Sequence, residues 1–151
     1  MIHLQQTKAN SSDFAVLIDQ LNLYLHSING ESDAFFKQHN QVDLNMLVII
    51  AYADEKAVGC GAFKVINDQY VEIKRMFILP EYRKKGIAST LLVALEEWAK
   101  ELGYQKARLE TAKSMEDAVF LYRKNHYYEI PNFDQYIGVE SSVCFEKNLA
   151  K

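Results

Sequence analysis

The chain contains few of the residues that cross-link or interrupt small proteins. Its 151 residues include two cysteines, two prolines and six glycines. Cys60 and Cys144 are far apart in the sequence, so we interpret both as free thiols in a reducing cytoplasm. The first residues lack the basic and apolar regions of a signal peptide, and no apolar run reaches the roughly 18 residues of a membrane span. These absences predict a cytoplasmic protein without a transmembrane segment.

The sequence also lacks an excess of positive charge. Lysine and arginine number 17 and aspartate and glutamate 20, which gives a net charge of -3 at pH 7. This balance argues against nucleic acid or an anionic membrane as the main partner. The four histidines do not have the spacing of metal ligands, so we expect no metal. The basic run Arg83–Lys85 is therefore a local feature, which suits a small anionic ligand.

What the sequence does contain is a succession of apolar strands and amphipathic helices. A chain of 151 residues suits a single domain, over residues 1–151, with a sizeable core. We predict strands over 2–6, 45–52, 57–66, 71–79, 106–111, 127–130 and 142–146, and helices over 11–29, 32–39, 87–102 and 115–125. Strand, helix and strand from 71 to 111 imply a right-handed crossover and a parallel pair. The predicted fold class is α/β (α+β): a mixed, mostly antiparallel sheet of about six or seven strands flanked by about four helices.

The segment Arg83–Ala88 (Arg-Lys-Lys-Gly-Ile-Ala) combines cations, a glycine and the start of a helix. It follows the strand that Pro80 closes and opens the helix that Gly103 ends. The first amides of a helix have no intrahelical partner and point at a bound anion, which the helix dipole also favours. Gly86 has no Cβ, so a bulky phosphate can approach the main chain, and small Ala88 keeps that approach open. We interpret the segment as a pyrophosphate cradle, with an ordinary solvated basic turn as the alternative.

This segment matches neither the nucleoside-triphosphate loop, which needs Gly-x-x-x-x-Gly-Lys-Ser/Thr, nor the three-glycine dinucleotide fingerprint. Its spacing Arg-x-x-Gly-x-Ala, after a strand and into a helix, resembles the acyl-coenzyme A signature of the GCN5-related N-acetyltransferase (GNAT) family. Val71–Tyr82 resembles the family's fourth strand running into this loop. Ala118–Lys124 is similar to its Ala-x-x-Leu-Tyr-x-Lys helix, and Ser142–Lys147 resembles the ending of one bacterial branch. The resemblance spans roughly residues 47–149, about two-thirds of the chain.

The chain departs from the family pattern at two positions. Met115 stands where many relatives have an asparagine that contacts the cofactor. His126 stands where many have a glycine before the aromatic residue, here Tyr127, that follows the helix. At these two positions we expect the chain to differ from its relatives.

The resemblance implies a GNAT-like sheet and acetyl-coenzyme A as the cosubstrate. It also implies that the main chain at the end of the fourth strand pairs with the pantetheine arm, in a wedge between the fourth and fifth strands. The residues implied to bind the cofactor are Met76, Phe77, Ile78, Arg83, Lys84, Lys85, Gly86, Ile87, Ala88 and Ser89.

Acetyl transfer to an amine needs a proton for the leaving thiolate and a base for the amine. Tyr122 matches the acid of the family's Leu-Tyr pair, and a phenol keeps its proton at neutral pH. The alternative is a tyrosine that only packs on the sheet. Glu72 is the candidate base, directly or through a water. An acidic residue within an otherwise apolar strand is unusual and calls for an explanation, which a catalytic role would give. The alternative is that Glu72 is only a strand residue, paired with Lys74 or another surface charge. Glu110 is a weaker candidate for the base.

Several tyrosines could shape the acceptor site, although aromatic clusters more often serve packing; they are Tyr70, Tyr127, Tyr128 and Tyr136. Catalysis through a thiolate of Cys60 or Cys144 is disfavoured, because direct attack by the amine suffices.

Two functions are consistent with the resemblance. The first is an N-acetyltransferase that moves an acetyl group from acetyl-coenzyme A to a primary amine of a small molecule or protein, by direct attack in a ternary complex. The second is a non-catalytic module that binds acyl-coenzyme A as a sensor or partner domain. The C-terminal strands offer a route to a homodimer, but neither the acceptor, nor the oligomeric state, nor the use of other acyl groups follows from the sequence.

Overall fold

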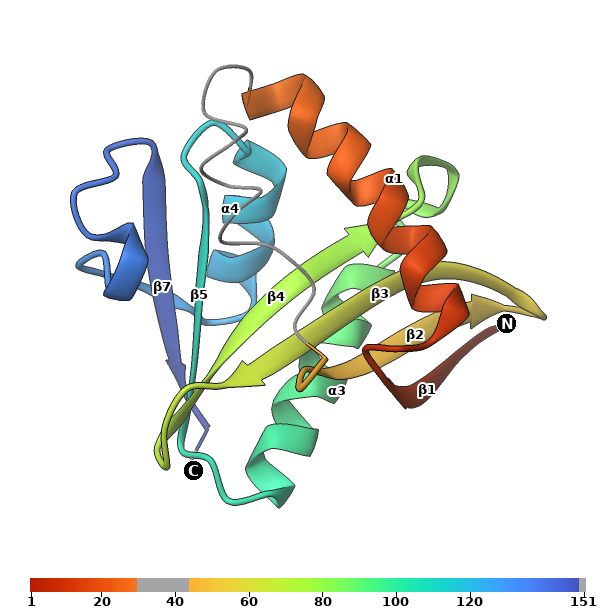
Figure 1. Ribbon diagram of the computed structural model, residues 1–151, viewed down its shortest axis with the longest axis horizontal. Coiled ribbons are helices and arrows are strands. Elements are labelled where there is room, and N and C mark those ends of the chain that lie inside the picture. Colours follow the sequence, from red (N-terminus) through yellow and green to blue (C-terminus); the bar gives the residue numbers. More distant parts are fainter. Residues whose placement is uncertain (30–43, 150–151) are drawn as a thin grey trace. The chain divides into compact units, whose positions relative to one another are not determined.

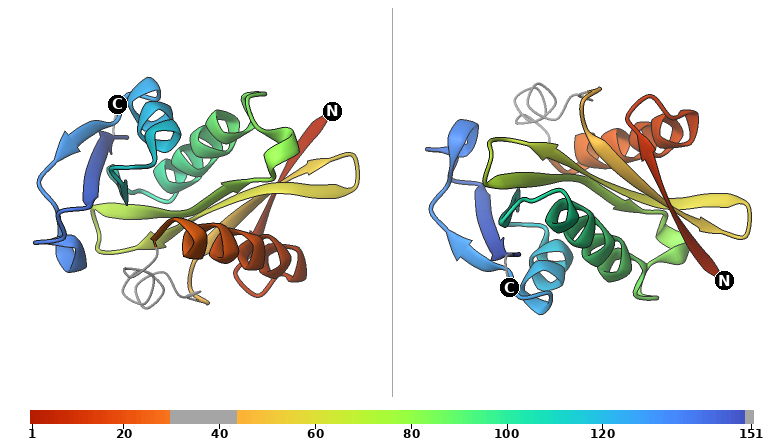
Figure 2. Two further views of the ribbon diagram at one scale, coloured as in Figure 1. Left: turned by 90° about the horizontal axis from the view of Figure 1, so that it is seen from above. Right: turned by 90° about the horizontal axis from the view of Figure 1, so that it is seen from below.

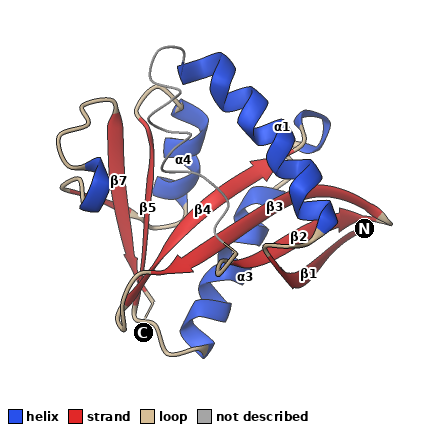
Figure 3. Ribbon diagram, viewed as in Figure 1, coloured by secondary structure: helices blue, strands red, loops and turns tan. Residues whose placement is uncertain are grey.

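The predicted succession of strands and helices is present in the computed structural model of the chain, which describes residues 1–29 and 44–149 (Figure 1). The strands are β1 (Ile2–Lys8), β2 (Leu47–Ala53), β3 (Lys56–Val65), β4 (Tyr70–Ile78), β5 (Lys106–Ala112), β6 (Tyr128–Ile130) and β7 (Ser142–Asn148). The α-helices in the described part are α1 (Ser12–Asn29), α3 (Ile87–Glu101) and α4 (Glu116–Lys124), and two short 3-10 helices are η2 (Pro80–Tyr82) and η3 (Asp134–Tyr136) (Figure 3). The helix predicted over 32–39 lies outside the described residues.

The strands form one seven-stranded sheet in the order β1-β2-β3-β4-β5-β7-β6. The pair β4–β5, which the α3 crossover joins, is parallel, whereas β1–β2, β2–β3, β5–β7 and β6–β7 are antiparallel. The prediction of a mixed, mostly antiparallel sheet flanked by helices is therefore confirmed. None of the helices in residues 1–29 and 44–149 is long and apolar enough to cross a membrane.

The ends of α3 follow the signals in its sequence. Gly103 has a φ of +100°, and its amide donates to the Lys100 carbonyl at 3.0 Å while the Tyr104 amide donates to the Ala99 carbonyl at 3.1 Å. Such bonds satisfy carbonyls that the end of a helix would leave without partners. Gly103 therefore ends α3 as predicted.

Contacts within the chain divide it into two compact units, and each is described by itself. The first unit contains Met1–Lys64 and Lys74–Leu95, and the second contains Val65–Ile73 and Glu96–Lys151. The loop before α3 belongs to the first unit. The residues Glu72 and Tyr122 belong to the second.

In the first unit, α1 and the first turns of α3 cover opposite faces of the sheet (Figure 2). The α1 side chains Phe14, Leu17, Ile18 and Leu21 and the α3 side chains Ile87, Leu91 and Leu95 are buried. A Cβ placed on Gly61 would lie 2.5 Å from the Met76 sulfur and 2.8 Å from Leu95 Cδ1. Because glycine has no side chain, α3 can pack closely on β3 at this point.

In the second unit, α4 and η3 lie on opposite sides of the β5–β7 pair (Figure 2). Side chains of successive strand residues point to opposite faces of a sheet, so neighbouring residues of β7 lie on different faces. Phe145 contacts Tyr122 on the α4 side, whereas Cys144 packs with Phe133 and Tyr136 on the η3 side. This alternation divides the candidate catalytic residues between the two faces.

Candidate functional site

The loop before α3 has the backbone geometry of an anion site. Lys84 and Gly86 have φ angles of 62° and 82°, both in the left-handed region. The hydrogen bonding of α3 begins with the Thr90 amide, which donates to the Gly86 carbonyl at 3.1 Å. The amides of Ile87 and Ala88 precede that bond, and among the described residues no carbonyl accepts from them.

The space in front of Gly86 is open. An ideal Cβ built on this residue meets no atom within 4 Å, and Lys84, Lys85 and Gly86 are exposed. An anion can therefore reach the amides and gain from the dipole of α3. The loop fits a diphosphate, because it presents donors, positive charge and room in one place.

Arg83 makes a contact that the sequence does not predict. Its Nε donates to the Ile78 carbonyl at 2.8 Å, and its guanidinium lies 5.4 Å from the ring centroid of Tyr24 and 5.6 Å from that of Phe77. These contacts tie the loop to the end of β4 and to α1. In the free protein Arg83 thus holds the shape of the loop.

The other residues implied to bind the cofactor lie in the same unit. Met76, Phe77 and Ile78 form the end of β4, and Ser89 lies in the first turn of α3. Pairing of β4 with β5 covers Tyr70–Glu72 and Lys106–Arg108, although each strand continues beyond these residues. The β4–β5 register therefore covers only the first residues of each strand.

Glu72 is buried in the second unit, with 3% of its surface exposed. The Tyr136 hydroxyl donates to Glu72 Oε2 at 2.8 Å, and Arg108 lies opposite Glu72 in the β4–β5 register. A buried carboxylate needs a donor such as the Tyr136 hydroxyl, because leaving water without one is unfavourable. Glu72 is thus not an exposed charge on the strand surface.

Tyr122 is buried on α4, with 7% exposure. Its ring centroid lies 5.8 Å from that of Tyr127 and 6.3 Å from that of Phe145. Burial and the charge of Glu110 raise the pKa of the Tyr122 phenol above its ordinary value. The hydroxyl therefore keeps its proton at neutral pH, and among the described residues no side chain accepts a hydrogen bond from it.

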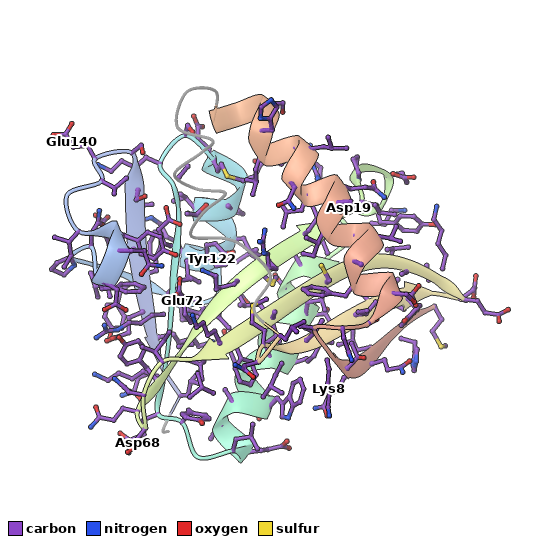
Figure 4. The ribbon with its side chains drawn as sticks, in the orientation of Figure 1. Lys8, Asp19, Asp68, Glu72, Tyr122 and Glu140 are labelled. Carbon is purple, nitrogen blue, oxygen red and sulfur yellow. The ribbon has the colours of Figure 1, made fainter. Side chains whose placement is uncertain are left out.

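The structure brings Glu72 and Tyr122 to different surroundings in the second unit. Figure 4 labels Glu72 on β4 and Tyr122 on α4. Glu72 bonds to Tyr136 on the η3 side of the sheet, and Tyr122 packs on Phe145 on the α4 side. An acid for the leaving sulfur and a base for the amine have different targets, so they need not touch each other.

The other candidates are less suited to catalysis: the Glu110 carboxylate accepts a hydrogen bond, and the Cys60 and Cys144 thiols keep their protons. The Ser142 hydroxyl donates to Glu110 Oε2 at 2.5 Å. Burial raises the pKa of Cys60 to about 12, against the lowering effect of Arg75, and burial also raises the pKa of Cys144 to about 11. Thiols with such pKa values carry little thiolate at neutral pH, which makes both poor nucleophiles. In the described part of the chain, no three His, Cys, Asp or Glu side chains group as metal ligands would.

Comparison with known proteins identifies the family. The model of the acetyltransferase (GNAT) family matches residues 16–127. The chain belongs to this family. The predicted family and the expectation of a GNAT-type acyltransferase are therefore confirmed.

Several known proteins are similar to this GNAT chain in sequence or in fold. A protein from Azospirillum brasilense named IAA acetyltransferase is 30% identical over 135 residues, which cover 88% of each chain. A structure from Klebsiella pneumoniae, provisionally assigned as an acyl-CoA N-acyltransferase, has a TM-score of 0.84 and 26% identity and covers 99% of this chain and 98% of its own. The PaiA N-acetyltransferase of Thermoplasma acidophilum, solved in complex with coenzyme A, has a TM-score of 0.71 at 19% identity and covers 98% of this chain and 99% of its own.

The two departures from the GNAT pattern have local explanations. His126 has a φ of 74°, so it adopts the left-handed conformation that glycine favours, and the turn is formed without the glycine. Met115 is the N-cap of α4 and makes no side-chain capping bond. Its sulfur instead accepts a weak bond from the Thr111 hydroxyl at 3.8 Å.

Sequence reasoning named Tyr136 only as one of several aromatic residues that could shape an acceptor site. It did not find the contact with Glu72, because the two residues are 64 positions apart. It also did not find Arg75, which has a φ of 60° within β4. No motif marks either feature, so only the folded arrangement reveals them.

Proposed function

We propose that residues 1–151 form one acetyltransferase domain that transfers an acetyl group from acetyl-coenzyme A to a primary amine. The family match over residues 16–127 supports this, since it includes residues of both compact units. The observation that carries the proposal is the loop at Gly86, where the space in front of the glycine is open, the described residues give the Ile87 and Ala88 amides no carbonyl partner, and Lys84 and Lys85 are exposed.

The diphosphate of coenzyme A is proposed to bind at this loop. The amides of Gly86, Ile87 and Ala88 would donate to it, Lys84 and Lys85 would add charge, and Ser89 would add a hydroxyl. The main chain of Met76–Ile78 would pair with the pantetheine arm. Arg83 would contribute by holding the loop against Ile78. Acetyl-coenzyme A supplies a thioester, whose acyl carbon bonds to the amine nitrogen as its bond to sulfur breaks.

Tyr122 is proposed as the general acid and Glu72 as the general base. Tyr122 Oη holds a proton at neutral pH because burial raises the phenol pKa, and it would donate that proton to the departing sulfur. Glu72, directly or through a water, would accept the proton that the amine gives up. The two transfers balance, since one proton reaches sulfur and one leaves nitrogen.

The acceptor is proposed to be a small-molecule amine or a protein amino group. The name of the Azospirillum brasilense relative supports acetyl transfer but does not define the acceptor of this chain. We propose the cytoplasm as the location, because Cys60 and Cys144 are both free thiols. A homodimer through the C-terminal strands stays a prediction, which sedimentation analysis would test.

A panel of primary amines tests the proposal. Wild-type protein and the variant Tyr122→Phe are incubated with acetyl-coenzyme A and each amine, and release of the coenzyme A thiol is followed. We expect turnover with at least one amine, and a loss of about 100-fold in kcat for Tyr122→Phe, because general acid catalysis contributes about that factor or more. Acetyl-coenzyme A affinity should not change.

The variant Tyr52→Phe is the matched control. Tyr52 Oη donates to Asp13 at 2.7 Å on the first unit, so the same atom is removed away from the proposed machinery. Binding of acetyl-coenzyme A without turnover of any amine would instead indicate a non-catalytic module. An unchanged kcat for Tyr122→Phe would remove Tyr122 from the role of acid.

A further inference from the structure

The contact between Tyr136 and Glu72 is the most enclosed polar pair that joins η3 to β4. Tyr136 is 1% exposed and Glu72 is 3% exposed, and the hydroxyl lies 2.8 Å from Glu72 Oε2. A hydrogen bond to an ionised group is shorter and stronger than one between neutral groups. A phenol in this position therefore fixes the direction of the carboxylate and gives its buried Oε2 a donor.

Contacts within the segment between β6 and β7 hold Tyr136 in place. The amide nitrogen Nδ2 of Asn132 lies 3.1 Å from the Tyr136 carbonyl, 3.0 Å from the Val139 carbonyl and 3.4 Å from the Ser142 carbonyl. The ring of Phe133 meets the Tyr136 ring edge to face, with centroids 5.5 Å apart. These contacts join both ends of the turn that carries η3, so the phenol has a defined place over the sheet.

Charged and titratable groups from the neighbouring strands face the pair. Glu110 and Arg108 come from β5, Cys144 from β7 and Tyr70 from β4. Burial and the charges of Glu72 and Glu110 raise the pKa of Tyr136 well above its ordinary value. The phenol therefore stays protonated over the working range of pH, and it acts toward Glu72 as a donor.

We propose that Tyr136 is a positioning residue, whose hydrogen bond directs the Glu72 carboxylate for the proton transfer from the acceptor amine. This inference rests on the proposed function, since it assigns Tyr136 a task in support of the base. It concerns the η3 side of the sheet and involves neither Tyr122 nor the loop at Gly86.

The direct test is a titration of the Glu72 carboxyl carbon by NMR, in protein labelled with ¹³C-glutamate. The signal is assigned by its loss in Glu72→Gln. In Tyr136→Phe the titration midpoint of Glu72 should move to higher pH by about one pH unit, since the hydrogen bond that the phenol donates to the carboxylate is lost. In Tyr52→Phe, which also loses a phenol bonded to a carboxylate, the midpoint should not move.

Kinetics with an amine from the panel give the second readout. The acidic limb of the pH profile of kcat/KM should move to higher pH in Tyr136→Phe. Relative to the wild type, kcat/KM should fall about tenfold at pH values below that limb and change little at pH values above it. A merely structural role would lower activity at every pH. If Tyr136→Phe does not fold, Asn132→Ser, which loosens the same turn, should shift the midpoint in the same direction by a smaller amount.

The outcomes separate the two proposals. An unmoved Glu72 midpoint in a folded Tyr136→Phe protein would overturn the positioning role, even if Glu72→Gln abolishes turnover. A moved midpoint together with full activity of Glu72→Gln would overturn the role of Glu72 as base and, with it, the purpose assigned to Tyr136. A moved midpoint with a shifted acidic limb supports both.

Discussion

At the scale of the residue, Gly86 has a backbone conformation and an open front that only glycine combines without strain. Its φ is +82°, and a Cβ there would meet no atom within 4 Å. A side chain at this position would project into the space that the proposed diphosphate needs. A substitution at Gly86 should therefore affect the stability of the free protein and its affinity for the ligand through two different causes, which can be measured separately.

The matched pair Gly86→Ala and Gly103→Ala makes this separation measurable. Gly103 has a φ of +100° and equally open surroundings, but it lies at the other end of α3. Both variants should lose about 1 kcal/mol of unfolding free energy in urea, because alanine is strained at positive φ. In calorimetric titration only Gly86→Ala should weaken acetyl-coenzyme A, by about tenfold, since its Cβ would obstruct the amides. Equal affinities in the two variants would argue against the loop as the binding site.

The roles of the candidate-site residues differ in how far they could be predicted from the sequence. Gly86 is predictable, because its glycine, its cations and the start of a helix are consecutive. Tyr122 is predictable only through resemblance to a family helix, since one tyrosine in an amphipathic helix carries no signal of its own. Tyr136 is not predictable as a partner of Glu72, because the fold brings together residues that are distant in sequence.

At the scale of the element, a buried ion pair joins α3 to β7 within the second unit. Lys147 Nζ lies 2.8 Å from Glu96 Oε1, and the Tyr127 hydroxyl donates to Glu96 Oε2 at 2.8 Å. The two charged side chains are 22% and 7% exposed, respectively. Removing one partner leaves the other charge in a poorly solvated place.

Glu96→Ala should therefore lower the free energy of unfolding by about 2–3 kcal/mol, as expected for breaking a largely buried pair. Glu129→Ala is the matched control, because the Arg123–Glu129 pair is 55% and 57% exposed. The control should cost less than about 1 kcal/mol, since exposed pairs contribute little. Chemical denaturation measures both, and equal losses would contradict the assignment of Glu96 as a structural anchor.

The pairing of β5, β6 and β7 is linked to pH through Glu146. Burial alone would raise its pKa, but hydrogen bonds from Tyr128 and Arg108 and the charges of Arg108 and Lys106 outweigh burial, so the pKa lies below its ordinary value. Arg108 Nε is 2.7 Å from Glu146 Oε1, and Tyr128 Oη is 2.6 Å from Oε2. A depressed pKa means that the stabilisation is complete above the unfolded pKa and is lost as pH falls through the folded pKa.

Glu146→Gln should accordingly be less stable than the wild type at pH 7, with a difference that shrinks as pH falls below about 4.5. Urea denaturation between pH 7 and pH 3 measures this. Glu55→Gln, which makes the same chemical change in the exposed turn between β2 and β3, serves as the control. A difference for Glu146→Gln that stays constant with pH would contradict the linkage.

Strands and helices were predictable where their periodicity is strong. The apolar run of β2 and the amphipathic pattern of α3 identify their elements, and Gly103 marks the end of α3. The placement of β7 between β5 and β6 was not predictable, because strand order depends on contacts between segments far apart in the chain. The same limit applies to η3, which carries Tyr136 and has no periodic pattern.

At the scale of the whole molecule, the chain is acidic, with a net charge of -3, while its proposed cofactor loop is basic. A local cluster of cations and amides on such a protein selects a small anion over an extended polyanion. Acetyl-coenzyme A matches this charge arrangement, and the family match over residues 16–127 supports the same ligand. The proposed function therefore depends on the amides at the start of α3.

The most direct test follows the backbone amides by ¹H–¹⁵N NMR while coenzyme A is added to the complete protein. We predict that the amides of Gly86, Ile87 and Ala88 shift strongly and saturably, whereas the amide of Gly103 does not move. Saturable binding that leaves the amides of residues 86–88 unchanged, or no binding at millimolar coenzyme A, would contradict binding of the cofactor at this loop.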